Sequence, residues 1–178
     1  MKVFKFGGAS VKDANGVRNL AKVLQHEGIE NKLVIVSAMG KMTNAFEAII
    51  NAYYNKSNDL PDKINFVEKY HLEIINDLFD KDDEIYNEVN FLFGELGGFL
   101  ATNTSQDYNF IYDQLVGFGE LISTKIVSAY LFKIGINNKW IDVRDYIKTD
   151  SNHRDAKVNW ELTEDIIENK IYMLGETK

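Results

Sequence analysis

The chain has 178 residues, enough for one domain with a sizeable core, and its 45% apolar content is typical of a soluble globular protein. A net charge of −7 argues against a nucleic-acid surface, and the lack of cysteine excludes disulfides, thiolate metal sites and thiol nucleophiles. We expect no apolar run of membrane-spanning length and no signal segment, and hence a cytoplasmic protein. His26, His71 and His153 show no metal-ligand spacing, so no metal site is predicted.

A short strand leads straight into a glycine turn at the start of the chain. Residues 2–6 predict the strand, Lys5 stands near its end, and Gly7 and Gly8 follow before Ser10. Backbone N–H groups in such a turn, a helix N-terminus and a lysine form a cradle for an anion such as phosphate. Lys5 has an alternative interpretation, an edge-strand lysine whose amine lies in solvent. The segment has neither the P-loop spacing nor G-x-G-x-x-G.

The next segments continue the order of strand, loop and helix. Ser10 and Asp13 resemble a capping box, which predicts a helix behind them. The continuous apolar run 33–36 suits a parallel strand that is covered on both faces. A second loop follows, and Asn44 with Glu47 resembles another capping box. This order is typical of an α/β fold.

The later segments are mostly helical by their pattern. Residues 61–105 predict a helical excursion from the sheet rather than a separate domain, and residues 107–134 predict a third group of helices. Residues 139–143 predict a third strand. We expect a short amphipathic helix at residues 160–169 and the beginning of another strand at residues 170–174.

Two polar residues stand at predicted helix starts. Thr43 either caps its helix or presents a hydroxyl to a substrate carboxylate beside the first N–H groups of that helix. Glu120 follows Gly119 and precedes a strongly apolar helix, where an unpaired acid is costly. It is either satisfied by its own helix amides or anchors a substrate ammonium group. The residues alone leave both alternatives open.

A dense polar group follows the third predicted strand: Asp142, Arg144, Asp145, Thr149 and Asp150. Ligands of open α/β sheets bind at the carboxyl ends of strands, which would make this group part of a site. The residues favour the other interpretation, an internal Asp–Arg salt-bridge network that shapes a loop.

Four segments, in order, resemble motifs of the aspartate kinases, which belong to the amino-acid kinase family. Residues 5–11 read K-F-G-G-A-S-V and resemble K-F-G-G-T-S-V, and residues 36–44 read V-S-A-M-G-K-M-T-N and resemble V-S-A-M-G-x-x-T-N. Residues 119–123 read G-E-L-I-S and resemble G-E-x-x-S. Residues 142–150 read D-V-R-D-Y-I-K-T-D and resemble D-A-R-D-x-I-x-T-D. The resemblance extends to about residue 170, and the ordered set is far more specific than any one motif.

The resemblance implies a fold and an activity. Residues 1–178 are expected to form the N-terminal, substrate-binding lobe of an amino-acid kinase domain, an incomplete three-layer α/β/α sandwich with a mainly parallel central sheet of the carbamate kinase-like type. The implied reaction transfers a phosphoryl group from MgATP, as co-substrate, to the side-chain carboxylate of L-aspartate. It gives 4-phospho-L-aspartate, the first step towards lysine, threonine and methionine. The resemblance implies no tightly bound cofactor, a homo-oligomer, and no nucleic-acid or membrane partner.

The same resemblance implies roles for individual residues. Lys5 would be the catalytic lysine, bridging the ATP phosphates and offsetting charge on the transferred group. The implied phosphate-binding residues are Lys5, Phe6, Gly7, Gly8 and Ser10. Thr43 and Glu120 would hold the aspartate, Glu120 through the α-ammonium group. Loop support is assigned to Asp142, Arg144, Thr149 and Asp150. An ionised carboxylate nucleophile needs no general base, which agrees with the lack of a candidate histidine.

Two departures from the family pattern bear on activity. Ala9 replaces the usual threonine, although the backbone donors of the loop remain. The 178 residues contain no G-F-I-G strand and no G-R-G-G-S-D-type loop. We therefore expect the ATP-binding half and the ACT regulatory domains to be absent, and this chain alone to be inactive.

Two other interpretations remain. One is a non-catalytic module that binds aspartate or dimerises through an open sheet edge. The other is a kinase of glutamate, acetylglutamate or UMP, against which the second and fourth motifs argue.

Overall fold

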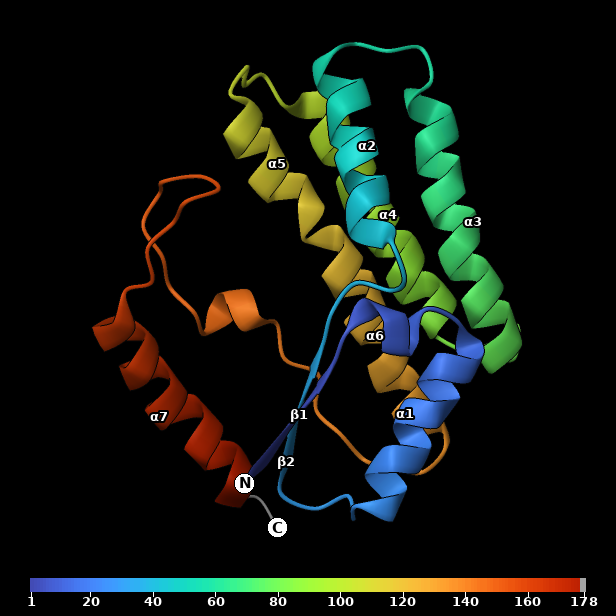
Figure 1. The fold of residues 1–178 in the computed structure, drawn as a ribbon, viewed down its shortest axis with the longest axis vertical. Coiled ribbons are helices and arrows are strands. Elements are labelled where there is room, and N and C mark those ends of the chain that lie inside the picture. Colours follow the sequence, from blue (N-terminus) through green and yellow to red (C-terminus); the bar gives the residue numbers. More distant parts are fainter. Residues whose placement is uncertain (177–178) are drawn as a thin grey trace. The chain divides into compact units, whose positions relative to one another are not determined.

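The computed structural model describes the backbone of residues 1–176 and the side chains of residues 1–170. Internal contacts divide the chain into two units, Met1–Trp140 and Ile141–Lys178. The first unit combines a parallel sheet with mostly helical structure (Figure 1), which confirms the predicted α/β class.

The sheet of the first unit has two parallel strands, β1 (Lys2–Phe6) and β2 (Lys32–Val36), paired in register along their full length. Their β-branched and aromatic residues favour a pleated, half-buried surface. The connection between them contains a short 3₁₀ helix, η1 (Gly8–Val11), and helix α1 (Ala14–His26). Both strands therefore point their carboxyl ends towards the same edge, where the two glycine-containing loops begin.

Helix α1 begins later than the sequence predicts. The carboxylate of Asp13 is its N-cap and accepts the Gly16 N–H at 2.8 Å. Ser10 lies in η1 instead, so the predicted Ser10–Asp13 capping box is wrong. A Cβ on Gly16 would lie 2.5 Å from the Ser10 carbonyl oxygen, so the chain doubles back tightly on this turn before the helix starts.

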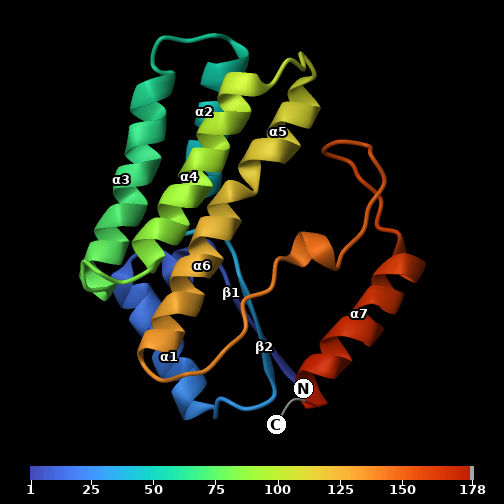
Figure 2. The same cartoon turned by 180° about the vertical axis from the view of Figure 1, so that it is seen from behind.

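Five further helices complete the first unit: α2 (Met42–Tyr54), α3 (Leu60–Leu78), α4 (Ile85–Thr102), α5 (Tyr108–Val116) and α6 (Phe118–Lys133). α2 packs on α3 and α5, and α4 packs on α6. Figures 1 and 2 show α5 and α6 running almost end to end. Only Gly117 separates them.

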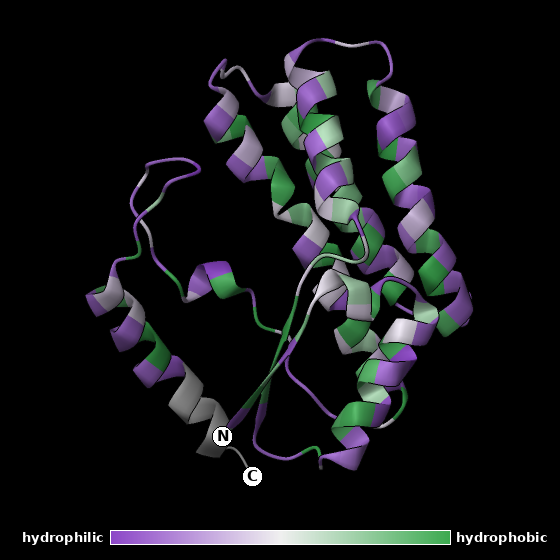
Figure 3. Cartoon of the chain, viewed as in Figure 1, coloured by the Kyte–Doolittle hydropathy of each residue, from purple (hydrophilic) through white to green (hydrophobic). Residues whose placement is uncertain are grey.

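The core lies between the sheet and these helices. Phe46, Ile49 and Ile50 of α2 and Ile122 and Ile126 of α6 are fully buried. Figure 3 shows the alternation of apolar and polar surface on α1 and α3 that is expected of helices packing one face on a core. Within β1 and β2, the residues that pack on this core are Phe4, Phe6, Val34 and Val36.

One helical segment contradicts the expectation that no apolar run is long enough to span a membrane. Tyr108–Lys133, which is α5 followed by α6, is long and apolar enough to cross a membrane by length and composition. Half of its most apolar window is buried inside the structure, and its apolar residues pack in the core of the first unit. Core helices of soluble proteins pass the same test, so its composition is explained by packing.

Residues 139–143 and 170–174 differ from the prediction. Residues 139–143 form no strand, because a strand needs a backbone partner and the described chain offers none here. The short 3₁₀ helix η2 (Val143–Asp145) follows instead. Helix α7 (Trp160–Glu176) continues through residues 170–174, where we expected a strand, since no glycine or proline precedes Gly175 to end it.

Candidate functional site

The first glycine loop follows β1. Gly7 has a φ of −76°, which any residue adopts, and a Cβ built on it meets nothing within 4 Å. Neither conformation nor packing within the described chain therefore requires glycine at this position. The Ser10 N–H donates to the Gly7 carbonyl at 2.9 Å, which places Ser10 in the 3₁₀ turn rather than at the start of α1.

The second loop, residues 37–41, packs backbone to backbone against the first. The Gly40 N–H donates to the Gly8 carbonyl at 2.9 Å, and the Ser37 N–H donates to the Phe6 carbonyl at 3.1 Å. A Cβ on Gly8 would lie 2.6 Å from the Ala38 carbonyl oxygen. Gly8 is thus required by space alone, whether or not a ligand is bound.

Thr43 is half-buried in the first turn of α2. The helix begins at Met42, and its N-cap residue, Lys41, makes no side-chain capping bond. The predicted Asn44–Glu47 capping box is therefore wrong; the Glu47 carboxylate instead accepts a hydrogen bond from the Tyr112 hydroxyl at 2.7 Å. An uncapped helix N-terminus has backbone N–H groups and a positive dipole end that attract carboxylates.

The start of α6 docks onto the second loop. A Cβ on Gly119 would lie 3.1 Å from the Ala38 Cβ and 3.2 Å from the Phe46 ring, so a small residue is needed there. The hydroxyl of Ser123, which is fully buried, donates to the Ser37 carbonyl at 2.8 Å. These contacts bring the first three motifs of the sequence into one place.

Among the residues that the structure describes, the two charged candidates of the first unit have no side-chain partner. Glu120 lies half-buried in the first turn of α6, and within the described residues no hydrogen bond or ion pair reaches its carboxylate. Lys5 lies on β1 opposite Ile35, is exposed, and has no ion pair with any side chain that the structure describes. Both groups are therefore available to a ligand.

The fourth motif lies in the second unit and forms an internal network. The Asp142 carboxylate accepts the Arg144 backbone N–H and its guanidinium, the closest contact being 2.6 Å from Nη2. Hydrogen bonding to that guanidinium holds the pKa of Asp142 below its usual value. Thr149 forms an isolated antiparallel bridge with Val158, and the Asp150 carboxylate accepts the Lys157 N–H at 3.2 Å. These residues shape the loop that precedes α7.

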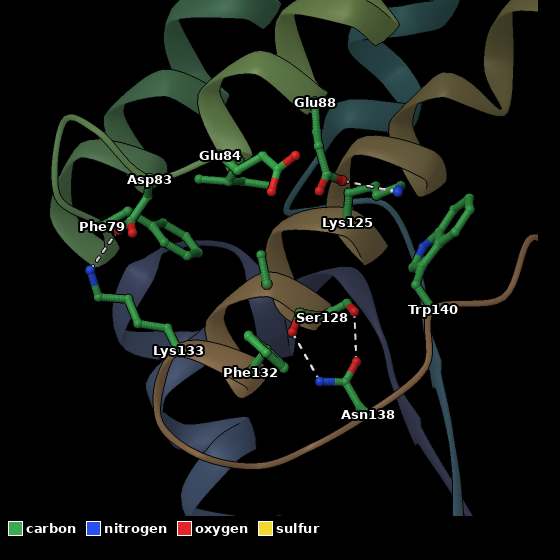
Figure 4. A pocket seen from close by; sticks show the side chains of 12 residues that line it. Phe79, Asp83, Glu84, Glu88, Lys125, Ser128, Phe132, Lys133, Asn138 and Trp140 are labelled. Carbon is green, nitrogen blue, oxygen red and sulfur yellow. Dashed lines mark hydrogen bonds and ion pairs between the residues drawn. The ribbon is translucent and has the colours of Figure 1, made fainter.

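A cavity of about 500 Å³ lies elsewhere in the first unit, between α4, α6 and residues 138–140 (Figure 4). Several of its polar groups pair with one another: Lys125 pairs with Glu88 at 2.9 Å, and the Ser128 hydroxyl donates to Asn138 at 2.6 Å. None of the predicted site residues lines it. Nor do the described residues contain a group of three or more His, Cys, Asp or Glu that could hold a metal ion.

Comparison with known proteins identifies the family of the chain. The chain belongs to the amino acid kinase family, whose model matches residues 1–177. It is 31% identical over 152 residues to bifunctional aspartokinase/homoserine dehydrogenase 2 of Arabidopsis thaliana, a match that covers 82% of this chain and 16% of that protein. It is 30% identical to aspartokinase 2 of the same plant over 158 residues, covering 83% of this chain and 28% of that one. Both relatives are named as chloroplastic proteins.

Solved structures support the fold. E. coli aspartokinase III in complex with aspartate and ADP matches with a TM-score of 0.85 at 22% identity, covering 98% of this chain and 38% of that chain. Clostridium acetobutylicum aspartate kinase matches with a TM-score of 0.74 at 20% identity, covering 97% and 36%. The chain thus has the fold of the corresponding part of these proteins and spans well under half of their length.

Sequence reasoning missed two structural contributors near the site. Ser123 stands in the third motif, but only its contact with Ser37 reveals that it fastens α6 to the second loop. Tyr70 of α3 lies outside all four motifs and contacts both loops. Helical periodicity places Tyr70 on a packed face, but no local signal marks it as a neighbour of residues 30 and 58 positions away.

Proposed function

We propose that this chain forms the aspartate-binding and phosphate-contacting part of an aspartate kinase. The reaction would transfer the terminal phosphoryl group of MgATP to the side-chain carboxylate of L-aspartate, on the route to lysine, threonine and methionine. The observation that carries the proposal is the convergence of the first three motifs. The two glycine loops and the start of α6 are joined by the contacts of Gly8, Gly40, Gly119 and Ser123.

Phosphoryl transfer requires little of the protein beyond positioning of the reactants and fixed positive charge. Phosphoryl transfer to an ionised carboxylate needs no general base, because the nucleophile carries its lone pairs already. The unpaired ammonium of Lys5 would offset charge on the phosphoryl oxygens. No contact among the described residues requires glycine at position 7, so Gly7 leaves room for a phosphate to approach the backbone.

Aspartate would be held by the starts of two helices. The uncapped N-terminus of α2, with the Thr43 hydroxyl, offers donors to a carboxylate. The Glu120 carboxylate lies in the first turn of α6 without a partner among the described residues, and it would pair with the α-ammonium group. A half-buried acid without a partner is costly, and a substrate ammonium group would remove that cost.

Calorimetric titration with aspartate, glutamate and UMP tests the substrate class. We expect aspartate to bind best, and Glu120→Gln to weaken its binding by about 10- to 100-fold, the value of a charged hydrogen bond. Glu95→Gln, at an exposed acid on α4, is the matched control and should leave binding unchanged. Tighter binding of glutamate or UMP, or equal affinities of wild type and Glu120→Gln, contradicts the proposal.

A coupled ADP-release assay tests activity. Because this chain covers 38% of the aspartokinase III chain that it resembles, we propose that it does not turn over alone. Turnover near that of an intact aspartate kinase would overturn this part of the proposal while leaving the substrate class standing.

A further inference from the structure

Tyr70 reaches the first loop from a helix that none of the four motifs includes. It lies in the middle of α3, and its hydroxyl donates a hydrogen bond to the carbonyl oxygen of Lys12, the residue that ends η1. Burial raises the pKa of the Tyr70 phenol, so the group remains a protonated donor across the neutral range. The bond thus ties α3 to the end of the first loop.

The same hydroxyl contacts the second loop. Gly40 has a φ of +56°, and a Cβ on it would lie 2.5 Å from the Tyr70 oxygen and 3.5 Å from the ring carbon that bears it. The Gly40 backbone therefore rests directly on the phenol, with no room for a methyl group between them. Glycine is required here twice, by its positive φ and by this contact.

The contacts of Tyr70 connect α3 to both glycine loops, which also contact each other. The Tyr70 hydroxyl touches Lys12 and Gly40, and the Gly40 N–H donates to Gly8 in the first loop at 2.9 Å. The phenol ring is itself held, because the ring of His71, which is fully buried, packs edge-on against it with centroids 5.4 Å apart. A rigid side chain on α3 therefore sets how far apart the two loops stand.

We propose that Tyr70 is a positioning residue for the phosphoryl-transfer site, holding the Gly40 loop against the Gly7–Val11 loop. The inference rests on the proposed function, in which these loops carry the phosphate and lead into the aspartate-binding start of α2. In this role α3, which is part of the helical excursion, holds the two loops together through a side chain that the strands and loops themselves do not provide.

Tyr70→Phe tests the claim, since it keeps the ring and removes only the hydroxyl. Tyr86→Phe is the matched control, because it removes a hydrogen bond of 2.9 Å between α4 and Asn76 of α3, away from the loops. Amide hydrogen exchange at Gly40 reports the loop contact without any ligand. We expect about fivefold faster exchange at Gly40 in Tyr70→Phe, the value of one hydrogen bond, and no change there in Tyr86→Phe.

Aspartate titration of the same three proteins supplies the second readout. Affinity should fall about fivefold in Tyr70→Phe and stay at the wild-type value in Tyr86→Phe. Unchanged exchange at Gly40 in Tyr70→Phe overturns the inference. Faster exchange with unchanged aspartate affinity also overturns it, because the contact would then be structural only. If the wild-type chain binds no aspartate, the proposed function has failed, and exchange at Gly40 alone decides whether Tyr70 holds the loops.

Discussion

His71 makes the stability of this protein depend on pH. The ring is fully buried on α3, its Nδ1 donates to the Val67 carbonyl at 2.8 Å, and its Nε2 has no partner among the described residues. Burial disfavours the imidazolium and lowers the pKa of His71 from 6.5 to about 4. The unfolded chain binds the proton below pH 6.5, whereas the folded chain resists it until about pH 4, so stability falls as pH falls through this window.

The magnitude follows from the shift. A difference of about 2.5 pKa units at about 1.4 kcal/mol each gives a loss of about 2 kcal/mol at pH 5 and about 3 kcal/mol at pH 4, relative to pH 7.5. Asp59, Asp77 and Asp83, whose pKa values are lowered by their lysine or arginine partners, also lose stabilising charge as pH falls. A direct pH profile of the wild type therefore mixes several groups.

Comparison of the wild type with His71→Leu separates the contribution of His71 from those of the carboxylates. Urea unfolding of both proteins from pH 4 to 7.5 gives a difference in unfolding free energy from which the carboxylate contributions cancel. We expect this difference to move by about 3 kcal/mol in favour of the variant as pH falls. A wild-type-minus-variant difference that stays constant across the range refutes the reasoning.

Four glycine and serine substitutions test the packing of the loops, with Gly97 of α4 as the one outside them. Gly8→Ala should destabilise by about 2 kcal/mol, since its Cβ would lie 2.6 Å from the Ala38 carbonyl oxygen, whereas Gly97→Ala, with open space at its Cβ, should stabilise α4 by about 1 kcal/mol in the same urea assay. Gly7→Ala should leave the unfolding midpoint unchanged but weaken ADP binding measured by calorimetry; a loss of stability without a loss of binding would contradict its assigned role. Ser123→Ala should cost about 1 to 2 kcal/mol, because the half-buried Ser37 carbonyl loses its donor, and a change under about 0.3 kcal/mol in thermal or urea unfolding would contradict that contact.

The sequence predicted those parts of the fold that have a local cause. The apolar runs 2–6 and 33–36 form the two strands, and Phe46, Ile49 and Ile50 form the buried stripe of α2. Residues 139–143 have the same strand-like composition, yet they form no strand because pairing requires a neighbour that composition does not reveal. The prediction of a capping box at Asn44 and Glu47 is wrong for a similar reason. The Glu47 carboxylate accepts a hydrogen bond from the hydroxyl of Tyr112, a partner 65 residues away that local sequence does not reveal.

The candidate site also contains residues that local sequence marks and residues that only distant contacts reveal. Gly7, Thr43 and Glu120 were candidates from their local pattern, and motif resemblance implied their roles. The structure places Gly7 in the first loop and Thr43 and Glu120 in the first turns of α2 and α6. Ser123 and Tyr70 act on backbone carbonyls of distant residues, so neither spacing nor residue type marks their contacts in advance.

The most direct test of the account is to locate bound aspartate on the isotopically labelled chain by NMR titration. We expect saturable shifts of the amide signals of residues 37–43 and 117–120, with a dissociation constant that Glu120→Gln raises by about 10- to 100-fold. Shifts confined to the cavity lined by Lys125 and Trp140, or no saturable shift at any described residue, would contradict it.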